Sequence, residues 1–170
     1  MKQTVRTLAM LMMVVACSIM MSCSSDDDDN NVNGERMVVI NGTHYPLYFG
    51  FYDTEDGELH MEFINFDPFN PTNLPQSANA LTINIDELSD LEQGTYKGDL
   101  EFWSTAIYTD DFYGSANGTV DVTIEKKGAY YVITIPESTV NFYYDENFDE
   151  SERVSLSFNF TGPMEYSEFE

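Results

Sequence analysis

Residues 154–161 read Val-Ser-Leu-Ser-Phe-Asn-Phe-Thr, a strict alternation of apolar and polar side chains. Successive side chains of a β-strand point to opposite faces of a sheet, so this period of two gives one apolar face and one polar face. A strand of this kind packs one side against a core and leaves the other side in water, which is typical of antiparallel sheets. The stretch therefore predicts a half-buried β-strand.

The same period recurs along the chain. Leu81, Ile83 and Ile85 alternate with polar residues, and Val120 and Ile124 belong to a second alternating segment at 119–126. Further strands are expected at 37–40, 44–52, 59–66, 96–108, 130–135 and 139–145. Together these segments predict an all-β fold of about nine strands, either an antiparallel β-sandwich or a closed up-and-down barrel of the lipocalin type.

Turn residues separate these segments. Asn41-Gly42 suits a type I′ hairpin, because both central residues of that turn need positive φ, and Lys127-Gly128 is expected to act in the same manner. Asp56-Gly57 lies between two expected strands. Residues 67–75 contain three prolines and cannot form a central strand. A helical turn is expected, if anywhere, only at 86–93.

Composition sets limits on function. The chain has 170 residues, with 7 Lys and Arg against 30 Asp and Glu, and a formal net charge of −23. Its hydrophobic content of 42% is too high for a disordered acidic chain, so we expect a folded core in a single domain. The scarcity of Lys and Arg argues against nucleic acid as a partner, since phosphate binding depends on those side chains.

The amino terminus has the pattern of a targeting segment. Lys2 and Arg6 precede an apolar run from Leu8 to Met21. At about 14 residues this run is shorter than a membrane-spanning helix, which needs about 20, and it has the length of a signal-peptide hydrophobic region. We therefore expect residues 1–22 to be removed as a signal peptide.

The residues at the end of this run resemble a bacterial lipobox. In Met20-Met21-Ser22-Cys23 a small residue precedes a cysteine, and this resemblance implies cleavage before Cys23 and its acylation with fatty acids such as palmitate. Cys17, after Val14-Val15-Ala16, is the alternative, but cleavage there leaves Ile19-Met20-Met21 in the mature tail. Because two or three acyl chains hold a protein firmly, the resemblance implies a membrane anchor.

The acidic stretch that follows is similar to the export signal of Bacteroidota surface lipoproteins. It comprises Ser25, Asp26, Asp27, Asp28 and Asp29. This resemblance implies transport to the outer face of the outer membrane, with residues 23–35 as a lipidated flexible acidic linker. Three later segments, at 94–96, 118–122 and 130–135, also resemble the layout of small Bacteroidota lipoproteins, a resemblance that brings no ligand with it. Residues 36–170 are then expected to form the single all-β domain.

Motifs of catalysis are absent from the sequence. It has no Gly-rich phosphate loop, no His-Glu-x-x-His and no Gly-x-Ser-x-Gly. Both cysteines, Cys17 and Cys23, precede the domain, so neither a disulfide nor a cysteine nucleophile is expected in it. Its two histidines, His44 and His60, lie in expected strands. We therefore expect no enzyme and no cofactor.

One loop comes nearest to a metal site. Asp53, Glu55, Asp56 and Glu58 place four hard-oxygen side chains within six residues, which suits calcium. However, Gly57 is fifth in this loop, where an EF-hand has its glycine sixth, and no helices flank it. We expect no bound metal here and interpret the loop as a solvated hairpin tip.

Aromatic residues give the one indication of a binding surface. Trp103 is out of phase with Phe102 if its strand is regular, and Tyr108, Phe112 and Tyr113 follow closely. Such side chains stack on sugar rings. We expect a cell-surface binding or accessory module, without catalysis, for a glycan or a partner protein. The alternatives are a surface polysaccharide hydrolase and a structural component of a surface assembly, and the oligomeric state stays open.

Overall fold

The computed structural model describes residues 36–70, 74–107, 112–144 and 151–167, and within these ranges the chain forms strands, turns and loops but no helix. The expected all-β fold is confirmed. The expected signal peptide, Cys23, the acidic residues Ser25 to Asp29 and the aromatic Tyr108 lie outside the described residues.

Ten strands form one hydrogen-bonded sheet, where about nine strands were expected. Their bounds are β1 (Met37–Ile40), β2 (Thr43–Pro46), β3 (Phe49–Glu55), β4 (Glu58–Ile64), β5 (Ser77–Ile85), β6 (Gly94–Ala106), β7 (Phe112–Lys127), β8 (Tyr130–Tyr143), β9 (Ser151–Gly162) and β10 (Glu165–Tyr166). The order across the sheet is β10-β3-β4-β5-β6-β7-β8-β9-β1-β2. All neighbours are antiparallel except β10 and β3, which are parallel.

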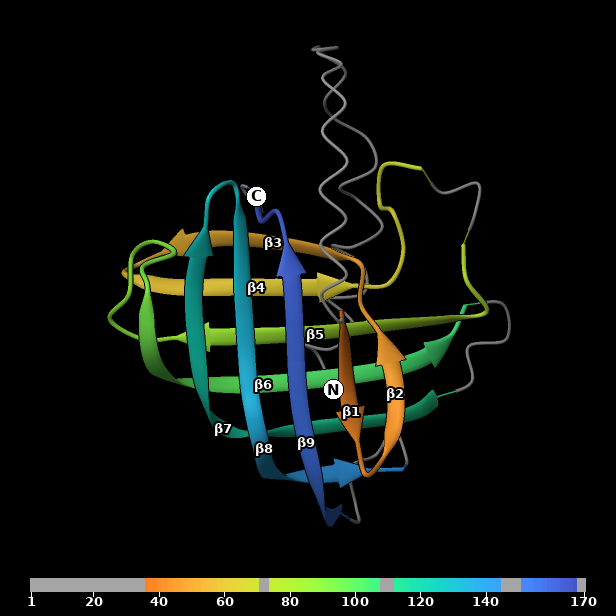
Figure 1. Cartoon of the computed structure of the whole chain (residues 1–170). Coiled ribbons are helices and arrows are strands. Elements are labelled where there is room, and N and C mark those ends of the chain that lie inside the picture. Colours follow the sequence, from red (N-terminus) through yellow and green to blue (C-terminus); the bar gives the residue numbers. More distant parts are fainter. Residues whose placement is uncertain (1–35, 71–73, 108–111, 145–150, 168–170) are drawn as a thin grey trace.

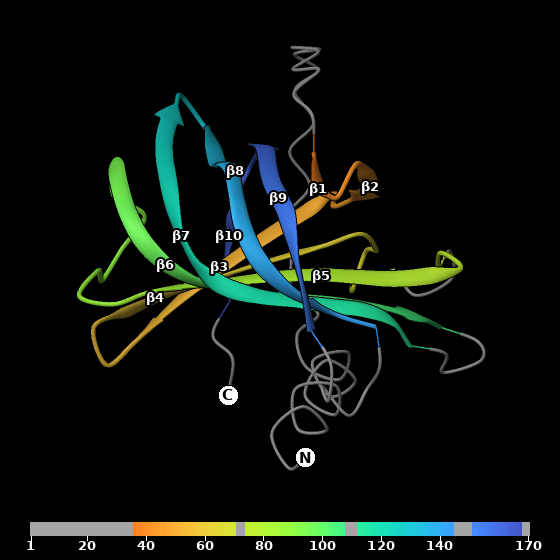
Figure 2. The ribbon, with the colours of Figure 1, turned by 90° about the horizontal axis from the view of Figure 1, so that it is seen from below.

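The sheet curls into a half-barrel with two layers. Figure 1 shows β3, β4, β5 and β6 crossing behind β8, β9, β1 and β2, and Figure 2 shows the curl from below. The strands β7 and β8 are long enough, at 16 and 14 residues, to bend from one layer into the other. We call β3–β6 the back layer and β8, β9, β1 and β2 the front layer.

The main core fills the space between the layers. The alternating residues Val154, Leu156, Phe158 and Phe160 are all buried there, as the sequence predicted. They meet the back layer at Phe63, whose ring centroid lies 4.7 Å from that of Phe158 and 4.9 Å from that of Phe160. Burying each such side chain contributes about 1.5–3 kcal/mol, so this face accounts for the closure of the two layers.

Two expected strands have different bounds in the structure. The segment 44–52 is interrupted, because the amide of Leu47 donates to the carbonyl of Arg36 and that of Tyr48 donates to Ile64 on β4. The chain thus crosses from the front layer to the back layer between β2 and β3. Conversely, 130–135 and 139–145 merge into β8, whose register with β9 shifts between Ile135 and Ser138.

The turns follow the sequence closely. Asn41 and Gly42 have φ of 49° and 81°, as the type I′ prediction requires, and Asp56 and Gly57 have 52° and 86°. The hairpin between β7 and β8 differs from the prediction that Lys127 and Gly128 are its two central residues. Lys127 is the last residue of β7 and pairs with Tyr130, so the central residues are Gly128 and Ala129. Only Gly128 has positive φ there, at 66°, as the first central residue of a type II′ turn requires. Residues 86–93 form turns and no helix.

Candidate functional site

A second apolar cluster lies on the outer side of the back layer. Phe51, Ile64 and Ala80 are its buried members. Neighbouring residues of the same strands, such as Phe63 on β4, belong instead to the main core, so this cluster faces away from the front layer. We call it the outer aromatic cluster, and its half-buried members are Phe49, Phe66 and Trp103.

Trp103 occupies a position with small neighbours. It lies on β6 opposite Ala80 of β5 and Ser115 of β7. Because Phe102 next to it is fully buried in the main core, the expected difference in phase between Trp103 and Phe102 is confirmed. Both cross-strand neighbours of Trp103 have small side chains. The indole is half-buried, so part of the ring is open to solvent.

A buried polar network fixes this part of β6. The hydroxyl of Ser104 donates to Oδ1 of Asn79 at 2.8 Å, and the backbone N–H of Asn79 donates to Oδ1 of Asn65 at 2.9 Å. Nδ2 of Asn65 donates to the carbonyl of Ser77 at 2.9 Å. These bonds connect β5 and β6 to the end of β4 directly beside Trp103. The sequence analysis missed them, although polar residues at apolar positions of a strand were the available signal.

Two further predicted aromatics lie near Trp103. Phe112 on β7 pairs with Thr105, which is two residues from Trp103 on β6, and Tyr113 is 53% exposed. The register shifts here, between Ser104 and Thr105 on β6. The structure therefore brings Trp103, Phe112 and Tyr113 to one end of the β6–β7 pair.

Carboxylates lie beside the outer aromatic cluster. Glu62 of β4 pairs with Phe51 of β3 and with Thr82 of β5, and Thr82 pairs in turn with Glu101 of β6. Glu101 is two residues from Trp103, so both side chains point to the outer face. The outer face of the back layer therefore carries aromatic side chains and carboxylates in adjacent rows.

Burial and the nearby charge of Asp53 raise the pKa of Glu62 to about 7. Burial also raises the pKa of Asp53, an effect that His60 opposes and Glu55 reinforces. Oδ1 of Asp53 is buried and accepts no hydrogen bond from the described residues. The two carboxyl groups are diagonal neighbours on the outer face, because Asp53 pairs with His60 and Phe51 pairs with Glu62. This is the part of the face most sensitive to pH.

The acidic loop at 53–58 is a hairpin tip, as the sequence analysis interpreted it. Glu55 and Glu58 pair at the end of β3 and β4, with Asp56 in the turn between them. In the described part of the chain, no three His, Cys, Asp or Glu side chains gather closely enough to hold a metal ion. The structure thus gives no support to a calcium site at Asp53, Glu55, Asp56 and Glu58.

The two histidines have separate neighbours. Nδ1 of His60 lies 2.9 Å from Oδ1 of Asn84, and Nε2 of the same ring lies 3.9 Å from a carboxylate oxygen of Glu58. Nδ1 of His44 lies 3.1 Å from Sδ of Met37 at the other end of the sheet order. They do not share a site.

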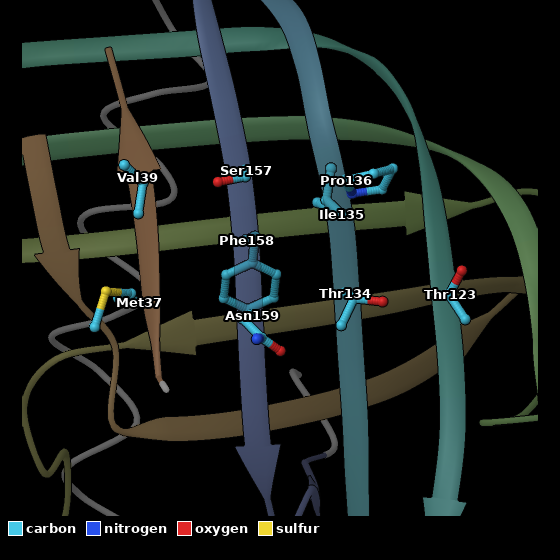
Figure 3. Close-up of a pocket in the computed structure, with 9 residues that line it drawn as sticks. All are labelled: Met37, Val39, Thr123, Thr134, Ile135, Pro136, Ser157, Phe158 and Asn159. Carbon is cyan, nitrogen blue, oxygen red and sulfur yellow. The ribbon is translucent and has the colours of Figure 1, made fainter. Parts of the chain in front are cut away.

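A shallow groove lies on the outer side of the front layer (Figure 3). It has a volume of about 350 Å³, and none of the residues that line it is charged, although the chain is strongly acidic. Its lining includes Met37, Val39, Thr123, Thr134 and Asn159. The sequence analysis did not find this groove, because its residues come from four strands that only the fold brings together.

Comparison of the chain with protein-family models, with curated proteins and with solved structures found no match. The described residues include no helix of the length and apolar character needed to span a membrane.

Proposed function

We propose that this chain is an outer-membrane lipoprotein, anchored through Cys23 and exposed on the cell surface, whose β-domain binds a ligand without catalysis. The ligand class from the sequence analysis is a glycan or a partner protein. The observation that supports binding best is Trp103, a half-buried indole on the outer face of the back layer, outside the main core. Aromatic side chains in such positions carry much of the energy of recognition.

The aromatic face is a better candidate than the front groove. Trp103 belongs to one cluster with Phe49, Phe51 and Phe66 on one sheet face, and Phe69, whose ring centroid is 6.3 Å from that of Phe51, is 71% exposed. Apolar surface of this kind on a soluble domain commonly marks an interaction site. The groove offers small hydroxyl and amide groups and no aromatic ring that faces it, since Phe158 belongs to the main core.

The anchor and the location are proposed from the sequence pattern alone. Replacement of Cys23 by serine is expected to remove the acyl chains and to release the protein from the membrane fraction. Replacement of Cys17 is expected to leave the anchored fraction unchanged. Metabolic labelling with palmitate, followed by protease treatment of intact cells, tests both points; an unlabelled Cys23, or a domain that external protease does not reach, contradicts the proposal.

A surface polysaccharide hydrolase is the second candidate, and Glu62 is the observation in its favour. A carboxyl group with its pKa raised to about 7 holds its proton near neutral pH, as the general acid of a glycosidase must. The hydrolase predicts turnover of a polysaccharide that Glu62→Gln abolishes. Binding without turnover in a broad substrate screen discards it.

Binding is tested with the full chain purified in detergent, on arrays of glycans and of proteins. The proposal predicts saturable binding that Trp103→Ala weakens by about tenfold or more. Tyr166→Ala is the matched control, because Tyr166 is 54% exposed and lies on β10, away from Trp103 in the sheet order. If both variants bind as the unmodified chain does, the aromatic face is not the binding site.

A further inference from the structure

We infer that the ligand of the outer aromatic face is cationic, a segment of a partner protein in which lysine or arginine side chains alternate with apolar ones. This inference rests on the proposed function and names its partner. Its basic side chains would stack on Trp103 and pair with Glu101 and Glu62, while its apolar side chains would cover the outer aromatic cluster.

The carboxylates Glu62 and Glu101 of the outer aromatic face are not neutralised by basic side chains of the described residues. Lys97 on β6 pairs with Asp121 at 2.7 Å, Lys127 on β7 pairs with Glu125 at 3.3 Å, and Arg153 lies on β9 in the front layer. Arg36 donates to two backbone carbonyls, and Lys126 lies 5.3 Å from the ring centroid of Tyr131. No ion pair within the described residues reaches Glu62 or Glu101. The face therefore carries negative charge that a cationic partner would neutralise.

Glu101 and Trp103 are spaced so that one cation can contact both side chains. Residues two apart on one strand point to the same face and lie about 6.8 Å apart. A cation within about 6 Å of an indole centroid is attracted by the ring, and an ion pair needs a separation of about 4 Å. One ammonium or guanidinium group can satisfy both conditions at once, because it fits between the carboxylate and the ring.

Glu62, Thr82 and Glu101, all among the described residues, offer a ligand hydrogen-bond acceptors and no free donor. The hydroxyl of Thr82, between Glu62 and Glu101, donates to the backbone carbonyl of Glu101 at 3.3 Å, so it is already in use. Glu62 and Glu101 offer acceptors when ionised. The ligand must supply the donors, as lysine and arginine do. An anionic ligand is disfavoured by the same carboxylates.

The apolar cluster decides between a protein and an amino sugar. Phe49 and Phe66, which are half-buried, extend the apolar surface away from Trp103, across β3 and past the end of β4. An amino sugar brings positive charge but has no apolar side chains to cover this area. A polypeptide that mixes basic and apolar residues covers both parts of the face, as protein interfaces do.

The buried carboxyl group Glu62 links binding to pH. A cation beside Glu62 favours its ionised form, so binding near neutral pH releases protons and becomes tighter as the pH rises from 6 to 8. On β5 the outward positions Thr82 and Asn84 do not titrate. The charged and titratable groups on this face are Asp53 and Glu55 from β3, Glu58 and His60 from β4, and Lys97, Asp99 and Glu101 from β6, and Lys97 pairs with Asp121 of β7.

The test is isothermal titration of the full chain with three probes. They are a short peptide that alternates lysine and leucine, the same peptide with every lysine acetylated, and a chitosan oligosaccharide. We expect the lysine peptide to bind, acetylation to weaken it by at least about tenfold, and Glu101→Gln to weaken it by about threefold to tenfold. Glu137→Gln is the matched control, because Glu137 is exposed on β8. Thermal unfolding confirms that each variant is folded.

Each other result overturns the inference. If Glu137→Gln weakens the lysine peptide as much as Glu101→Gln does, the attraction is general and no face is selected. If chitosan binds and the lysine peptide does not, the partner is not a protein. If a neutral glycan binds in a manner that depends on Trp103 but not on salt, the inference fails while the proposed function stands. If no probe and no array component binds, both fail.

Discussion

Trp103 and Ala80 are cross-strand neighbours on the outer face of the back layer, and Ala80 is fully buried. The small side chain of Ala80 lets the indole lie close to the sheet, and the residue across from it on β7, Ser115, is also small. The position of Trp103 therefore depends on residues that do not themselves contact a ligand.

Ala80→Leu tests this dependence. The larger side chain is expected to displace the indole and to cost about 1–3 kcal/mol of unfolding free energy, because it overpacks a closed site. Trp103 is the only tryptophan of the chain, so its fluorescence reports the displacement directly. A shift of the emission maximum with binding weakened is the expected outcome. If emission and binding were both unchanged, the position of Trp103 would not depend on the size of the side chain at Ala80.

Asn79→Ala removes the acceptor for the hydroxyl of Ser104 in the buried network of β5 and β6. An unsatisfied buried hydroxyl costs about 1–3 kcal/mol, so urea unfolding should show a loss of that size. Asn84→Ala is the control, since the hydrogen bond that it removes, to His60, is on the outer face and only half-buried, where water can replace the lost partner. Equal losses in the two variants would contradict the role given to the network.

Gly114 accommodates the register shift beside Phe112. Its φ is 153°, and a Cβ atom added there collides with the ring of Phe142. Gly57 also has positive φ, at 86°, but a Cβ atom there meets nothing within 4 Å. Gly57→Ala should therefore cost about 1 kcal/mol, from backbone strain alone, and Gly114→Ala at least about 2 kcal/mol more. Chemical denaturation of both variants gives the comparison; similar losses would contradict it.

Glu62 makes the domain less stable as the pH rises. Its pKa is raised from 4.5 to about 7 by burial and by Asp53, so between these values the folded state keeps a proton that the unfolded state has lost. The free energy of unfolding therefore falls by about 1–3 kcal/mol in total as the pH rises from 4.5 to about 7. Below pH 4.5 both states hold the proton, and Glu62 adds no dependence on pH.

Glu62→Gln should remove this dependence. The variant is expected to be more stable than the unmodified chain at pH 8 and no more stable at pH 4. Glu137→Gln removes the same charge from an exposed position and serves as the control. Thermal unfolding from pH 4 to pH 9 provides the measurement. If the two glutamine variants show the same pH profile, the carboxyl of Glu62 is not held in its protonated form.

The sequence was most informative where one face of a strand is buried. The alternation at 154–160 predicted the buried face of β9, and Asn41-Gly42 predicted the turn between β1 and β2, because both depend on neighbouring residues alone. The sequence did not predict the strand bounds that depend on contacts with residues far away in the chain. The break at Leu47 and Tyr48 is set by hydrogen bonds to Arg36 and Ile64, and the parallel strand β10 has only two residues.

The sequence predicted those parts of the candidate site that depend on a single strand and missed those that depend on contacts between strands. The phase of Trp103 follows from its own strand, so its outward position could be expected. The carboxylate Glu62 could not be selected among 30 acidic residues, because its burial depends on strands β3 and β5. The aromatic cluster likewise joins residues from β3 to β6 that are far apart in the chain.

The most direct measurement of the central claim is quenching of Trp103 fluorescence in the full chain by acrylamide, caesium and iodide at low ionic strength. An indole on an outer face beside Glu62 and Glu101 should be quenched by acrylamide, and the ratio of its caesium to its iodide quenching constant should be several times the ratio for free N-acetyltryptophanamide. Changing both glutamates to glutamine should lower this ratio, whereas Glu137→Gln should leave it unchanged. Emission that acrylamide cannot quench, or a ratio equal to that of the free compound, would contradict the account.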